Sequence, residues 1–84
     1  MRTIWKFPLV ITDKQKITVP IGSNFVHCGL DPNGEPSIWY RVDPRLEAIE
    51  KDVYIVGTGN PLPDEALHHQ GSFVHGPFMW HVYV

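Results

Sequence analysis

The stretch that decides the fold is residues 24–43, which read NFVHCGLDPNGEPSIWYRVD. Asn33-Gly34 near its centre is a strong turn signal, because these two residues tolerate the positive φ angles that tight hairpin turns demand. The residues on either side are rich in aromatic and β-branched side chains, which favour strands. We therefore predict a β-hairpin with one strand over Asn24–Leu30 and the other over Ser37–Asp43.

The second strand of this hairpin has two different faces, because side chains alternate between faces along a strand. One face is apolar and carries Ile38, Tyr40 and Val42. The other face carries Trp39, Arg41 and Asp43, so that a tryptophan lies beside an arginine. Two roles are open for Trp39: burial, or a surface platform on which the base or ring of a ligand stacks.

The same signals extend outward to the rest of the chain, which contains 8 prolines and 7 glycines that punctuate many short elements. Further strands are predicted over Thr3–Phe7, Gln15–Val19, Val53–Gly57, Gln70–His75 and Phe78–Val84. Val53–Gly57 is apolar on both faces, which indicates a central strand. Pro44–Lys51 is predicted to be a loop. The fold class is therefore all-β: a small single-domain antiparallel sandwich or barrel of about six to seven strands over residues 1–84.

The composition argues against several classes of protein. A net charge of -2 and a pI near 6.2 lack the basic excess of proteins that bind long nucleic acid. No stretch approaches the ~20 apolar residues that span a bilayer, and no secretion signal is recognisable. The single cysteine, Cys28, has no internal disulfide partner. We expect a soluble, cytoplasmic protein without a membrane partner.

The last predicted strand, Phe78–Val84, is aromatic on both faces. Such a strand is prone to aggregate if its edge is left unpaired. It therefore lies either inside the sheet or against another subunit. A chain of 84 residues also buries a limited core. Both considerations favour a homo-oligomer.

The loop Gly57-Thr58-Gly59-Asn60, at the end of the predicted central strand, is a candidate anion site. Successive backbone N–H groups in such a loop can hold a phosphate or carboxylate, and Thr58 and Asn60 add side-chain donors. The alternative is a tight turn that needs positive φ and is closed by Pro61. The loop matches neither a P-loop nor a dinucleotide-binding fingerprint.

Three further side chains complete the candidate site or border it. Trp5 and Lys6 are neighbours on a strand and face opposite sides, so Lys6 points to solvent or to another subunit if Trp5 lies in the core. Trp80 is likewise expected in the core, because tryptophan buries a large area. His81 next to it either donates a hydrogen bond to a ligand or is a structural histidine.

Residues for catalysis or metal binding are not arranged in a recognisable pattern. The histidines lack the spacing of a zinc site. Cys28 shares a predicted face with Val26 and Leu30, which indicates a buried and inert thiol. The acidic residues Asp43 and Asp52, with others, are predicted to lie in loops without clear partners. We therefore predict no enzyme, no cofactor and no metal site.

Short motifs along almost the whole chain carry a family resemblance. They are Thr3-Ile4-Trp5-Lys6-Phe7-Pro8, Ile17-x-Val19-Pro20, Trp39 with Val42-Asp43-Pro44, Gly57-Thr58-Gly59-x-Pro61, Gly71-Ser72 and Trp80-His81-Val82. With these motifs the chain resembles a family of short proteins encoded by bacteriophages and prophages. Asn60 departs from the family pattern, in which histidine is usual at this position.

The resemblance implies a function. Small, β-rich, oligomeric phage proteins of this kind include sponges that sequester nucleotide signals of host immunity, such as the cyclic oligonucleotides of CBASS or the cyclic ADP-ribose isomers of Thoeris. A similar role here implies non-catalytic capture in the host cytoplasm. The expected ligand-binding residues are Lys6, Trp39, Arg41, Thr58, Gly59, Asn60 and His81. The alternative is a module that binds a host or phage protein through an exposed strand edge, with Phe78–Tyr83 as the expected contact.

Overall fold

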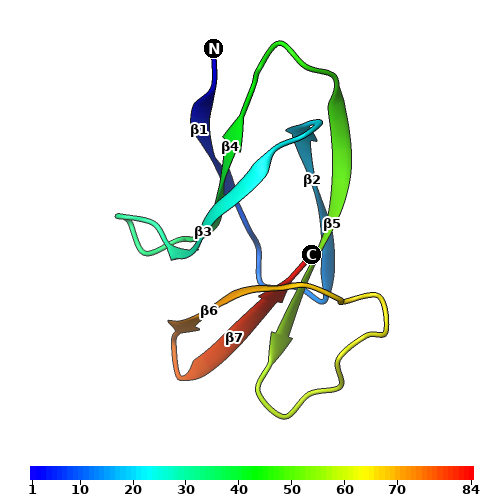
Figure 1. The fold of residues 1–84 in the computed structure, drawn as a ribbon. Helices are drawn as coiled ribbons and strands as arrows, with labels where there is room; N and C mark the ends of the chain where they lie inside the picture. Colours follow the sequence, from blue (N-terminus) through cyan, green and yellow to red (C-terminus); the bar gives the residue numbers. More distant parts are fainter.

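A computed structural model describes residues 1–84. It has seven strands, which are β1 (Thr3–Pro8), β2 (Lys14–Pro20), β3 (Asn24–Leu30), β4 (Pro36–Val42), β5 (Ala48–Gly57), β6 (His69–His75) and β7 (Phe78–Tyr83). They form two antiparallel sheets (Figure 1): sheet A, in the order β1-β4-β3, and sheet B, in the order β2-β5-β7-β6. The predicted all-β antiparallel fold is confirmed. None of its elements is a helix long and apolar enough to cross a membrane.

The β3–β4 hairpin forms where the sequence predicts it, but its turn differs in detail. Asp31 N–H donates to Glu35 O and Gly34 N–H to Asp31 O, each at 2.8 Å. Gly34 has a φ of 80°, whereas Asn33 does not adopt positive φ. This is a three-residue loop with glycine in the left-handed position, so the expectation that both residues supply positive φ is wrong.

The core lies where alternating side chains of the two sheets meet. The fully buried side chains include Ile38 and Val42 of β4, Val53 of β5 and Val82 of β7. Tyr40, between the two β4 residues on the same face, is 3% exposed. The alternation predicted for β4 thus separates a core face from the outer face of sheet A, which carries Trp39 and Arg41.

Strand β5 is longer than predicted. It begins at Ala48, so residues 48–51 are strand and the prediction of a loop up to Lys51 is wrong there. These residues pair with β2, and the register places Val19 opposite Ile49 and Pro20 opposite Ala48. Pairing with a distant segment overrides a weak local preference. The prediction that β5 is central is confirmed, because it lies between β2 and β7.

Strand β7 lies inside sheet B and pairs with β5 on one side and β6 on the other. Its aromatic side chains therefore do not belong to an exposed edge. The proposed partner contact through the edge of Phe78–Tyr83 is wrong for this reason, and one of the two arguments for a homo-oligomer is removed. The homo-oligomer itself stays a prediction. The outermost strands are β1 and β3 in sheet A and β2 and β6 in sheet B.

The two tryptophans that were predicted in the core have different surroundings. Trp80 is half-buried and packs against the hydrophobic core. Trp5 is 40% exposed, so its prediction as a core residue is wrong. The register places Trp5 opposite the buried Tyr40, on the inner face of sheet A, but β1 is an edge strand. The Trp5 ring packs edge-on against Phe7, with 6.4 Å between centroids.

Candidate ligand-binding site

A cavity of about 290 Å³ lies where β5 ends, beside β7. We call it the hydroxyl pocket. Its lining consists of Val56, Gly57, Thr58, Gly59, Asn60, Leu62, His81 and Tyr83. Four residues that the sequence singled out, Thr58, Gly59, Asn60 and His81, therefore line one cavity together. Neither Asp nor Glu lines it, so no carboxylate would repel an anion there.

The loop that forms one wall of this pocket is a tight turn. Asn60 N–H donates to Gly57 O at 3.0 Å, and Thr58 N–H donates to Met79 O of β7 at 3.4 Å. Gly59 has a φ of 88°, which favours glycine. The turn geometry predicted as one alternative is therefore present. It is compatible with the other alternative, because the Gly59 N–H makes no hydrogen bond within the chain.

His81 is held between two hydroxyl groups. Its Nε2 lies 2.7 Å from Thr58 Oγ1, and its Nδ1 lies 2.7 Å from Ser72 Oγ. Ser72 Oγ also lies 3.2 Å from His69 Nε2. Strand register brings these groups together, since Val56 of β5, His81 of β7 and Ser72 of β6 are directly opposite one another. The result is a continuous polar network across three strands.

This network has a simple electrostatic consequence. A neutral imidazole donates one hydrogen bond and accepts one, whereas a protonated imidazole donates two. His81 therefore accepts from one of the two hydroxyls and donates to the other. When the ring donates to Thr58 Oγ1, the Thr58 O–H is free to point into the hydroxyl pocket. An anion is the ligand that such an arrangement favours.

Two members of this network, His69 and Ser72, are not among the site residues predicted from the sequence. The alternation of β7 places His81 and Tyr83 on one face, which is readable from the sequence. The partners on β6 are not, because a β-bulge between His69 and Gly71 shifts the register. The sequence offered one signal for Ser72, because Gly71-Ser72 is among the motifs of the family resemblance.

A second cavity, of about 340 Å³, adjoins the first. We call it the tryptophan pocket. Its lining consists of Asp13, Ile55, Val56, Gly57, Asn60, Pro61, Pro63 and Trp80. Trp80 Nε1 is buried and has no hydrogen-bond partner in the chain. A buried donor without a partner is unusual in folded proteins. Because Trp80 Nε1 is inaccessible to solvent, this donor is not presented to the tryptophan pocket.

The remaining predicted residues, Lys6, Trp39 and Arg41, lie on the outer face of sheet A. Lys6 and Trp39 are directly opposite one another in the register. The Trp39 ring is half-buried and lies 5.3 Å from the His27 ring, centroid to centroid. Arg41 Nη2 donates to Asn24 Oδ1 at 2.9 Å. The structure thus separates the predicted set into two groups on different sheets, and a ligand role for this second group stays a prediction.

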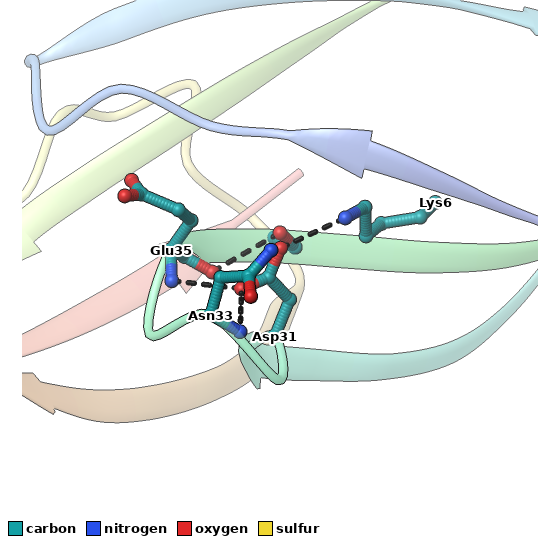
Figure 2. Close-up of polar contacts among 5 residues, drawn as sticks. Lys6, Asp31, Asn33 and Glu35 are labelled. Atoms are coloured by element: carbon teal, nitrogen blue, oxygen red, sulfur yellow. Dashed lines mark hydrogen bonds and ion pairs between the residues drawn. The ribbon is translucent and has the colours of Figure 1, made fainter.

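Lys6 already has an anionic partner (Figure 2). Its Nζ donates to Asp31 Oδ2 at 2.8 Å, and the Asp31 side chain is only 4% exposed. Asp31 Oδ1 accepts from the backbone N–H groups of Asn33 and Glu35, each at 2.9 Å. The Lys6 ammonium first, and then these N–H groups, lower the pKa of the Asp31 carboxyl. The ion pair therefore joins β1 to the β3–β4 turn.

The Cys28 thiol is buried, as predicted, and desolvation raises its pKa to about 11. The reason given for its burial was partly wrong, because Val26 and Leu30 are exposed. A β-bulge between Phe25 and His27 shifts the alternation of β3. A buried thiol with a raised pKa is a poor nucleophile at neutral pH.

Two acidic residues that the sequence left without partners have them. Arg45 Nη2 lies 2.9 Å from Asp43 Oδ2, and the pKa of Asp43 is strongly lowered, first by this hydrogen bond. Lys16 Nζ lies 2.9 Å from Asp52 Oδ1 across the β2–β5 pair, and Lys16 lowers the pKa of Asp52. Both are exposed pairs that hold local structure. Across the chain, no group of three or more His, Cys, Asp or Glu side chains is arranged to hold a metal ion.

Comparison with known proteins shows the family of the chain. No curated protein and no solved structure matches the chain significantly. One family model, described as a domain of unknown function (DUF7352), matches residues 1–84. The match covers every strand and both cavities. The chain therefore belongs to the DUF7352 family.

Proposed function

We propose that this chain is a non-catalytic binding protein that captures a small phosphate-bearing nucleotide in the hydroxyl pocket. The observation that carries the proposal is the convergence of Thr58, Gly59, Asn60 and His81 on one cavity. These groups supply hydroxyl, backbone N–H and amide donors without a carboxylate, and His81 Nε2 orients the Thr58 hydroxyl. The cavity, at about 290 Å³, is at the lower end of the range for small-ligand sites.

The biological role that fits this chemistry is sequestration of a nucleotide immune signal. The resemblance to phage and prophage proteins makes cyclic oligonucleotides and cyclic ADP-ribose isomers the first ligands to test. A protein that holds such a signal in the host cytoplasm would prevent it from reaching its effector. Sequestration requires a high affinity for the nucleotide and enough copies of the protein to bind it, and it requires no chemical step.

Binding without turnover is favoured by the surroundings of His81. A histidine that acts as a general base is usually oriented by a third group, most often a carboxylate, on the far side of its ring. Both ring nitrogens of His81 instead face hydroxyls, those of Thr58 and Ser72. The remaining nucleophile, Cys28, is buried on sheet A.

The test is depletion of a panel of cyclic oligonucleotides and cyclic ADP-ribose isomers by the purified full chain. After incubation, the free nucleotides are quantified by chromatography, and the protein is then heated to release what it holds. We expect one nucleotide to be depleted and then recovered intact. Thr58→Val, which removes the pocket hydroxyl, should weaken depletion about tenfold. The matched control is Thr18→Val, at an exposed position of β2 that lines neither cavity.

The outcomes separate the alternatives. Recovery of a degraded nucleotide would indicate hydrolysis and would point to Ser72 and His81 as its candidate residues. No depletion of any nucleotide in the panel would overturn the proposal. Equal loss in Thr58→Val and Thr18→Val would place the site elsewhere than in the hydroxyl pocket.

A second candidate function is protein binding through a strand edge, and β1 is the strand that favours it. It is outermost in sheet A, and its Ile4 and Trp5 side chains are exposed. The predicted homo-oligomer could use the same edge. Light scattering after size-exclusion chromatography would test this, with Trp5→Lys expected to lower the mass of an oligomer assembled through β1. A mass that Trp5→Lys leaves unchanged would exclude this edge.

A further inference from the structure

The hydroxyl pocket and the tryptophan pocket adjoin each other at the end of β5. They share Val56, Gly57 and Asn60, which form the end of β5 and the turn that follows it. A ligand that fills both would pass around this turn. The two parts also differ in chemistry, since one offers donors for an anion and the other is walled by an indole and two prolines.

Gly57 lines both pockets and is closely approached by other side chains. A Cβ at this position would lie 3.0 Å from Asn60 Nδ2 and 3.2 Å from Trp80 Cζ3, which is too close for ordinary packing. The absence of a side chain therefore lets the Asn60 amide and the Trp80 ring both approach the end of the strand on the side where a Cβ would project.

The tryptophan pocket has the chemistry of a site for a flat ring with N–H donors. Trp80, Pro61 and Pro63 provide apolar walls, and tryptophan is a good stacking surface for a base. Asp13, from the segment before β2, contributes a carboxylate to the same lining. A carboxylate accepts hydrogen bonds and is not a donor, so it selects ring edges that present N–H groups.

Resting on the proposed function, we propose that the site selects a guanine nucleotide, with the base in the tryptophan pocket and a phosphate in the hydroxyl pocket. Guanine presents two adjacent N–H donors, N1 and N2, which one carboxylate can accept together. Adenine presents its amino donor beside the N1 acceptor, whose lone pair faces the carboxylate unfavourably.

The test is calorimetric titration of the full chain with cyclic di-GMP and cyclic di-AMP, a pair that differs only in the base. We expect cyclic di-GMP to bind about tenfold more tightly or better. Asp13→Asn should reduce the affinity for cyclic di-GMP about tenfold and leave that for cyclic di-AMP unchanged. The matched control is Asp64→Asn, which removes the same charge from an exposed residue that lines neither cavity.

Each result decides the inference separately from the proposed function. Equal affinities for the two probes, or a preference that survives Asp13→Asn, would overturn guanine selection and leave nucleotide capture in place. An equal effect of Asp64→Asn would show that Asp13 acts through net charge alone, and this too would overturn the inference. Binding of neither probe would overturn it as well, and depletion of the other panel nucleotides then decides the proposed function.

Discussion

Strands β1 and β7 each place a tryptophan next to a basic side chain, Trp5-Lys6 and Trp80-His81, yet the two pairs have opposite surroundings. On β1, at the edge of sheet A, Trp5 is exposed and Lys6 is engaged with Asp31. On β7, inside sheet B, Trp80 packs on the core and His81 borders a cavity. Alternation correctly puts the two members of each pair on opposite faces. What each face meets depends on where the strand lies in its sheet.

The largest expected difference between the two strands is in stability. Trp80→Ala should lower the free energy of unfolding by about 3 kcal/mol, because it removes a ring packed against the core. Trp5→Ala should cost about 1 kcal/mol, since much of that ring is already exposed. Urea unfolding followed by far-UV circular dichroism measures both without relying on tryptophan fluorescence. Similar losses in the two variants would mean that Trp5 is covered in solution, for instance by a second copy of the chain.

The next difference is in ligand binding. His81→Gln should weaken binding of the nucleotide recovered from the panel about tenfold, because glutamine cannot contact the Thr58 and Ser72 hydroxyls at the same time, as the two ring nitrogens do. Lys6→Gln should change affinity less than about twofold, since the Lys6 ammonium is engaged with Asp31 away from both cavities. Calorimetric titration measures both, and circular dichroism checks that both variants are folded. A larger effect of Lys6→Gln would move the ligand site to sheet A.

Local patterns in the sequence were sufficient for much of the fold. The β3–β4 hairpin and the alternation of β4 depend on neighbouring residues, and both were predicted. The first part of β5 was not, because residues 48–51 are strand only through pairing with β2. The interior place of β7 depends on β6 and β5, which flank it, and no local pattern encodes the order of strands.

The candidate site was predictable in part for the same reason. Thr58, Gly59 and Asn60 are consecutive and form a turn, so their convergence needs no distant contact. His81 joins them only through the β5–β7 register. Lys6 and Arg41 looked free in the sequence, because their partners Asp31 and Asn24 come from other segments. When the partner of a charged residue comes from a distant segment, the pairing cannot be predicted from a single sequence.

The smallest expected effect concerns the ion pair that engages Lys6 on β1, and it depends on pH. The pKa of Asp31 is lowered from its usual value of 3.8, so its charged form stabilises the folded state. This contribution is complete above about pH 4 and is lost as the pH falls through the lower value of the folded state. Asp31→Asn should therefore be less stable than the wild type at pH 7, and the difference should shrink between pH 4 and pH 2.

The wild type and Asp31→Asn both lose stability in acid, because the pKa values of Asp43 and Asp52 are also lowered. Only the difference in their free energies of unfolding therefore reports on Asp31. Urea midpoints measured from pH 7 to pH 2 give this difference directly. Lys6→Gln should show a smaller pH-dependent difference than Asp31→Asn, since the N–H groups of Asn33 and Glu35 still favour the carboxylate. A difference that stays constant down to pH 2 would mean that Lys6 is not held by this ion pair in solution. Lys6 would then be as available to a ligand as His81, and the contrast between β1 and β7 would rest on their tryptophans alone.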